Sequence, residues 1–129
     1  MLALEREALA QADTDGVEQA LAWLAARSEQ GSGRERWLLR LVMARVAEQH
    51  GKSELALHLY GELDAGAQRH GLGEWEPELC FEVKARLLKL LRLKAQRNDA
   101  DRPALARQME AQLAALVSLD PVRAAVLCG

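Results

Sequence analysis

Histidine and cysteine are the residue types of this chain whose side chains could bind a metal or act as a nucleophile. The histidines are His50, His58 and His70, and none has a second histidine or a cysteine at the short spacing of zinc sites. His58 has only glutamates four residues away on either side. We therefore interpret the histidines as solvated helix surface and expect no metal.

The two cysteines, Cys80 and Cys128, do not form a spaced framework, so we expect reduced thiols in a cytosolic protein. Cys80 falls in an apolar helical pattern, where a thiol behaves as a small hydrophobe. No serine, histidine and aspartate grouping, phosphate-binding loop or paired buried carboxylates can be recognised. The sequence thus predicts no catalytic residue, no cofactor and no enzyme activity.

The segment of residues 71–79 is the most distinctive stretch of the chain. Two glycines allow a reversal, Trp75 and Glu76 follow, and Pro77 suits the first turn of a helix, where its missing N–H costs nothing. An aromatic residue in a glycine-bounded loop either fixes the corner or anchors an interface. In both cases we expect Trp75→Ala to destabilise the fold or to dissociate an assembly.

Three further positions are candidates for contacts with a partner. The run from Arg34 to Trp37 could bind an acidic partner, but we favour a charged first helical turn beside a core tryptophan. Leu57 lies off the apolar stripe formed by Leu55 and its helical neighbours, and Leu91 lies in a wide apolar arc. We expect Leu57 or Leu91 to face a neighbouring subunit.

These residues must be positioned by helices, because the composition disfavours strands. Half of the residues are apolar, mostly leucine and alanine, with few aromatic residues and no isoleucine. We predict an all-α fold, an antiparallel helical bundle or tetratricopeptide-like helix hairpins, with about six helices and a short C-terminal turn. Residues 1–129 should form a single helical oligomerisation domain, which at this length can bury about two thirds of its unfolded surface.

Local signals set the expected helix boundaries. The first helix should cover Leu2 to Ala12, since the cluster that ends in Gly16 supplies a stop and the next N-cap. Gly51 occupies the position of a left-handed C-cap, and Ser53 should cap the following helix. The other expected helices are Gly16 to Glu29, Arg34 to Gln49, Ser53 to His70 and Glu78 to Arg97. The sixth follows Asp101 and should bury Leu105, Met109, Leu113, Leu116 and Val117, and a final turn, Val122 to Leu127, should fold back.

The charge pattern and hydropathy exclude several kinds of partner. Seventeen basic and nineteen acidic residues give a net charge of −2, and both signs are mixed along every predicted helix. Such a surface does not attract phosphate backbones, so we expect no nucleic-acid partner. No apolar run approaches the roughly 20 residues that span a bilayer, and no signal peptide is recognised. We expect a cytoplasmic protein without direct membrane insertion.

The apolar pattern points to self-association. The helices expected at 34–49 and 78–97 are apolar over most of their circumference, more than one neighbouring layer needs to cover. Exposed apolar patches beyond a few hundred Å² mark interfaces, and closed symmetry buries them without forming fibres. We therefore expect a homo-oligomer.

Several runs together resemble a known family. The resemblance is to the C-terminal domain of TssA, a type VI secretion protein, in the branch whose full chain begins with an ImpA-type N-terminal region. It covers nearly the whole chain in the right order, and the corner Trp75-Glu76-Pro77 is its most specific element. The runs are residues 34–41, 55–57 with 63–64, 71–72, 74–79 and 119–121.

The resemblance implies a structural role. It implies a cytoplasmic scaffold that helps to organise the baseplate and the growth of the sheath around its inner tube. It also implies that this end of the chain forms ring-shaped, dihedral homo-oligomers. Because ImpA-type and middle regions are absent, the chain is expected to be a C-terminal fragment of a longer protein. The competing hypothesis is a monomeric tetratricopeptide-like adaptor that binds an extended peptide.

Overall fold

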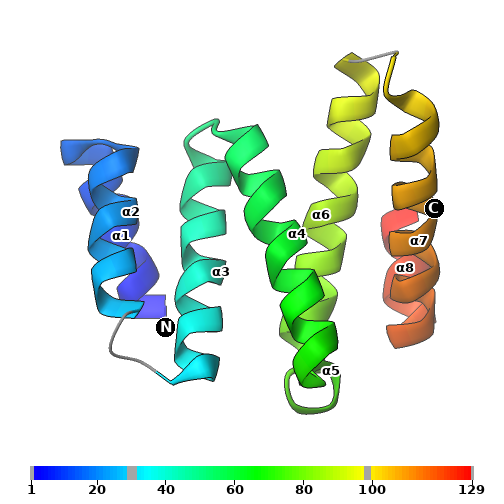
Figure 1. Ribbon diagram of the computed structural model, residues 1–129, viewed down its shortest axis with the longest axis horizontal. Coiled ribbons are helices and arrows are strands. Elements are labelled where there is room, and N and C mark those ends of the chain that lie inside the picture. The colour runs from blue at the N-terminus through cyan, green and yellow to red at the C-terminus, as the bar shows by residue number, and fades with distance from the viewer. Residues whose placement is uncertain (1, 29–31, 98–99, 129) are drawn as a thin grey trace. The chain divides into compact units, whose positions relative to one another are not determined.

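The computed structural model describes residues 2–28, 32–97 and 100–128, except for the side chains of residues 2, 3, 28, 73, 75 and 128. The described residues form helices and contain no strand, so the predicted all-α fold is confirmed (Figure 1). The chain divides into two compact units, residues 1–63 and 64–129, which are described one at a time. The helices are α1 (Leu2–Asp15), α2 (Val17–Ser28), α3 (Gly33–Gln49), α4 (Ser53–His70), α5 (Leu72–Trp75), α6 (Pro77–Arg97), α7 (Arg102–Leu119) and α8 (Pro121–Cys128).

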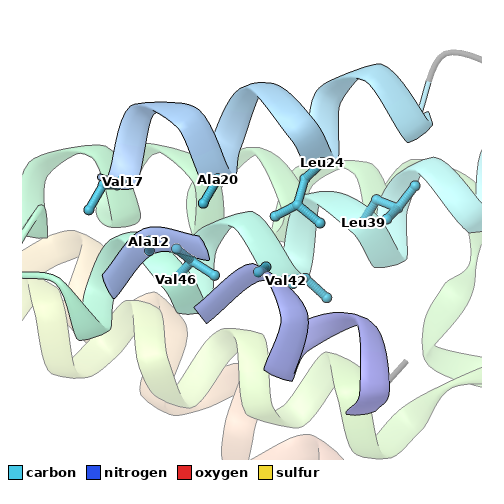
Figure 2. Packing of buried hydrophobic residues seen from close by; sticks show 8 residues of the cluster. Ala12, Val17, Ala20, Leu24, Leu39, Val42 and Val46 are labelled. Carbon is cyan, nitrogen blue, oxygen red and sulfur yellow. The ribbon is translucent and has the colours of Figure 1, made fainter. Parts of the chain in front are cut away.

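The first unit is built on α1, α2 and α3, which pack against one another in antiparallel order. Small and branched apolar side chains point from the three helices into a common core (Figure 2). Alanines let the helices approach closely, and the larger side chains fill the space between them. The core residues are Ala8, Ala12, Val17, Ala20, Leu24, Leu39, Val42 and Val46.

Both ends of α3 are fixed by capping. At its start the N–H of Glu35 donates to the hydroxyl of Ser32 over 3.2 Å. At its end Gly51 has a φ of 77°, as predicted, and donates to the Glu48 carbonyl, while Lys52 donates to the Ala47 carbonyl. These two bonds form a Schellman motif, which ends α3 sharply before α4 begins.

Two helix boundaries differ from the sequence-based prediction. Helix α1 continues to Asp15, because the Thr14 hydroxyl donates to the Ala10 carbonyl within the helix and does not act as a stop. The break falls at Gly16, whose φ of 102° favours glycine. Ser53 is the first residue of α4 rather than its cap, and the carbonyl of Lys52 receives the first helical hydrogen bond.

In the second unit the predicted corner is a reversal that contains a short helix. Gly71 has a φ of 62°, and α5 forms one turn before the chain enters α6. The Glu76 N–H donates to the Leu72 carbonyl over 2.7 Å, and the Glu76 carbonyl accepts from the Cys80 N–H over 3.0 Å. Pro77 is the first residue of α6, as predicted. Glu76 thus joins the two helices through its backbone.

Helices α6 and α7 pack side by side in opposite directions, and α8 packs on α7 (Figure 1). Their core contains Phe81, Leu88, Leu116 and Ala124. Because Ala124 belongs to α8 and is almost fully buried, the final helix folds back on its unit, as predicted. The α6–α7 pair therefore provides the base on which α8 is held.

Candidate functional site

The leucine-rich helices α3 and α6 do not carry surplus apolar surface. All large apolar side chains of these two helices are buried or half-buried. Each helix is central, α3 packing against α1 and α2 and α6 against α5 and α7. The expectation that a single chain cannot cover their apolar arcs is therefore wrong.

Leu57 and Leu91 are accordingly core residues, with 8% and 3% of their surface exposed. On α4 the predicted apolar stripe is confirmed at Ala56, Tyr60 and Leu63, which are buried. It is wrong at two positions, because Leu55 is exposed and Leu57 is buried. Leu57 lies seven residues before Asp64, which places both on one helix face, and both are buried. A role for Leu57 or Leu91 in self-association remains a prediction, and it requires these side chains to leave the core.

Exposed apolar surface is concentrated at the end of α7 and on α8, in residues 117–127, which we term the C-terminal apolar segment. Val122 and Val126 are 73% and 80% exposed. Six large apolar side chains are exposed among the described residues, and only Leu55 lies outside this segment. Large apolar side chains that stay exposed within one short segment make it a candidate interaction surface. Its members are Val117, Leu119, Val122, Val126 and Leu127.

Arg123 and its neighbours hold α8 in place. The Arg123 guanidinium lies over the Phe81 ring, 4.2 Å from its centroid, and its Nη1 is 3.2 Å from a carboxylate oxygen of Glu78. The Arg123 N–H donates to the Asp120 carboxylate over 3.1 Å, which caps the start of α8. Because Ala124 covers the inner face, α8 turns Val122 and Val126 outward.

Val117 was predicted to be buried and is 47% exposed, so this prediction is wrong. The inward face of α7 follows the spacing of Leu105, Met109, Gln112 and Leu116, and Val117 comes one residue after it. Gln112 occupies the position between two apolar turns. This polar residue within an apolar stripe is the sequence signal for a buried polar contact, and the prediction missed it.

Gln112 belongs to a polar network inside the second unit. The Lys84 ammonium lies 2.6 Å from one carboxylate oxygen of Asp64, and the Gln112 amide donates to the other over 2.9 Å. The Gln112 carbonyl oxygen is buried without a hydrogen-bond partner among the described residues. This network ties the last turns of α4 to α6 and α7.

The nearby Cys80 thiol is weakly reactive. Burial raises the pKa of Cys80, and the negative charges of Asp64 and Glu76 add to this effect while the Lys84 ammonium opposes it. A raised pKa keeps the thiol protonated and therefore weakly nucleophilic at neutral pH. The arrangement supports a structural role for this buried cysteine.

The remaining predicted positions separate into core and surface. Trp37 is buried, and its indole N–H donates to the Leu63 carbonyl over 3.0 Å, which confirms a core tryptophan. Arg34 and Pro77 are exposed and Glu76 is half-buried. The side chain of Trp75 lies outside the described part of the chain, so its role in the corner stays a prediction.

The described residues contain no group of three histidine, cysteine or acidic side chains placed to hold a metal ion. His50 instead lies 3.3 Å from the Asp13 carboxylate. Within the same residues, no helix combines the length and the apolar character needed to cross a membrane.

Comparison with known proteins identifies the family. The family model described as "Type VI secretion, EvfE, EvfF, ImpA, BimE, VC_A0119, VasJ" matches residues 3–87, about two thirds of the chain. The chain belongs to this type VI secretion family. It is a type VI secretion component, and the matched region ends within α6, before the C-terminal apolar segment. No curated protein matches.

A solved structure supports the type VI assignment. The chain is 57% identical to the C-terminal part of TssA from the EAEC type VI secretion system, with 98% of each chain covered and a TM-score of 0.92. It is also 57% identical to the C-terminal domain of the type VI TssA protein from Escherichia coli, again over 98% of each chain, with a TM-score of 0.49. The predicted resemblance to the TssA C-terminal domain is confirmed.

Proposed function

We propose that the chain is a self-associating scaffold domain that closes into a ring of dihedral symmetry and supports assembly of the type VI baseplate, sheath and tube. The support is membership of the type VI secretion family and likeness to the C-terminal domain of TssA over almost the whole chain. The proposed location is the cytoplasmic side of the secretion apparatus.

The observation that carries self-association is the C-terminal apolar segment. Exposed valine and leucine side chains in one short segment favour association, because burial removes apolar surface from water. Closed point-group symmetry limits the number of copies and avoids open filaments. A ring would therefore bury the exposed apolar side chains and also fix the number of copies.

A ring also suits a scaffold that has no recognised catalytic group. The baseplate and the sheath are repetitive, so several copies of one domain can bind several equivalent partner sites at once. Linked contacts of this kind raise the overall affinity by about 10²–10⁴ without new contacts in each copy. Individually weak contacts with baseplate, sheath and tube components would then suffice.

The mass of the purified 129-residue chain tests the proposal. Light scattering coupled to size exclusion, together with native mass spectrometry, should give one discrete oligomer larger than a dimer. A monodisperse monomer at high micromolar concentration overturns self-association. Binding of an extended peptide to that monomer in equal amounts would then favour the peptide adaptor.

A further inference from the structure

We propose that the buried polar network of Asp64, Lys84 and Gln112 is a binding site for an ordered water molecule. The water accepts a hydrogen bond from the Lys84 ammonium and donates one to the Gln112 carbonyl oxygen. The site lies inside the second unit, where the last turns of α4 meet α6 and α7. The inference does not depend on the proposed self-association.

The Gln112 carbonyl oxygen carries the inference. It is buried and has no hydrogen-bond partner in the described part of the chain. An unpaired buried acceptor is costly, and nearly all buried polar groups in native proteins bond to protein or to ordered water. Turning the amide round would not help, because the carbonyl oxygen would then face the Asp64 carboxylate, which can only accept.

The Lys84 ammonium supplies the matching donor. It has three N–H groups, and one of them donates to a carboxylate oxygen of Asp64 over 2.6 Å. The Gln112 amide donates to the other oxygen of the same carboxylate over 2.9 Å, so the Lys84 and Gln112 side chains meet at Asp64. A water between them connects a spare N–H to the unpaired carbonyl oxygen. Its second O–H can donate to Asp64, which completes the about two to four polar partners that a buried water needs.

The charges around the site favour water over an ion. Asp64 and Lys84 are both almost fully buried, and as a pair they are neutral. The Lys84 ammonium repels a cation, whereas the Asp64 carboxylate and the Gln112 oxygen repel an anion. Either ion would also add a net charge to a buried neutral pair, which is costly. The ligand is therefore a small neutral molecule that both accepts and donates hydrogen bonds, as water does.

The water adds a link that the direct hydrogen bonds lack. Asp64 on α4 bonds separately to Lys84 on α6 and to Gln112 on α7. The water joins Lys84 to Gln112, so each member of the network bonds to both of the others. Hydrogen bonds through an ordered water are nearly as favourable as direct ones, and a fully satisfied network holds its members in one arrangement. The water thus acts as a structural ligand.

A high-resolution crystal structure of the 129-residue chain tests the site. We expect a peak of electron density within about 2.7–3.2 Å of both Lys84 Nζ and Gln112 Oε1. A Gln112 carbonyl oxygen that has no neighbour, or that accepts directly from Lys84, overturns the proposal. Crystals grown in rubidium bromide distinguish water from an ion, because both of these ions scatter anomalously. Anomalous density at the site overturns the neutral ligand.

The variant Gln112→Met tests the site in solution. Methionine has nearly the length of glutamine but no carbonyl oxygen, so the water loses a partner and should leave. The amplitude of ¹⁷O relaxation dispersion reports long-lived buried waters, and it should fall by the equivalent of one molecule. Gln108→Met is the matched control on the same helix, because Gln108 is exposed, and it should leave the amplitude unchanged. Circular dichroism checks that both variants remain folded.

The outcomes separate this inference from the proposed function. Equal amplitudes for Gln112→Met and the wild-type chain overturn the bridging water. If Gln112→Met does not fold, the crystal structure of the wild-type chain still decides. The mass of the particle is read independently, so a monomeric chain that holds the water overturns self-association alone.

Discussion

Lys84 and Asp64 form an ion pair of 2.6 Å inside the second unit, with side chains only 10% and 8% exposed. Removing one member of a buried pair leaves the other charge uncompensated. Lys84→Met should therefore lower the free energy of unfolding by about 3–5 kcal/mol. Urea unfolding followed by circular dichroism at fixed protein concentration measures this loss.

The Arg40–Glu62 pair provides the control. Its atoms are 2.9 Å apart, but its side chains are 55% and 67% exposed. Because solvent screens such a pair, Arg40→Met should change the free energy of unfolding by no more than about 1 kcal/mol. Equal urea midpoints for Arg40→Met and Lys84→Met would contradict the prediction that burial makes the Lys84 pair indispensable.

Gly61 offers a stabilising substitution in the interior of α4. A Cβ added there meets no atom within 4 Å, and its φ does not fall in the left-handed region. Gly61→Ala should therefore raise the free energy of unfolding by about 0.5–1 kcal/mol, because alanine favours the helix. Gly51→Ala should act in the opposite direction, since Gly51 has a φ of 77°. Thermal melts showing the same sign for both would refute this reasoning.

The glycines and the proline at helix ends were the features best predicted from the sequence, because local chemistry determines them. Gly51 has the expected positive φ, Gly71 lies in the expected reversal, and Pro77 opens its helix. A glycine after a helix and a proline at its start act through their own backbone, without help from distant residues. The serine cap of α3 was missed, although Ser32 precedes Glu35 by the spacing of a capping box.

Which individual apolar side chains are buried was harder to predict, because neighbours far away in the sequence determine it. Leu57 and Val117 each lie beside an apolar stripe and could turn either way, yet the first is buried and the second is exposed. Gln112 turns inward because Asp64, 48 positions away in the sequence, accepts its hydrogen bond. The candidate site on α8 was missed for the same reason, since helical spacing cannot show that only one of two apolar faces is covered.

The Cys80 thiol should make stability depend on pH. Burial raises its pKa in the folded chain, whereas an unfolded thiol ionises near pH 8.5, about its ordinary pKa. Its contribution is therefore fully present below the unfolded pKa and is lost as the pH rises through the folded pKa. Urea midpoints measured across this alkaline range should fall less steeply for Cys80→Ala than for the wild-type chain. Parallel slopes would show that Cys80 does not titrate differently on unfolding.

Arg123 should control how firmly α8 is held on its unit. Arg123→Met keeps the aliphatic stem but removes the cation over the Phe81 ring, an interaction worth about 0.5–1 kcal/mol at an exposed site. The amides of α8 should then exchange with deuterium several-fold faster. The measurement compares Arg123→Met with the wild-type chain at the same protein concentration.

Glu78→Gln separates the two interactions of Arg123. It removes the ion pair but leaves the ring contact, and Glu78 is exposed enough for solvent to screen the pair. Hydrogen exchange of the α8 amides should therefore stay close to that of the chain without this substitution. If exchange in α8 became equally faster in Glu78→Gln and Arg123→Met, the ion pair would be what holds α8 on its unit. If exchange were unchanged in both variants, the apolar face around Ala124 would hold α8 alone.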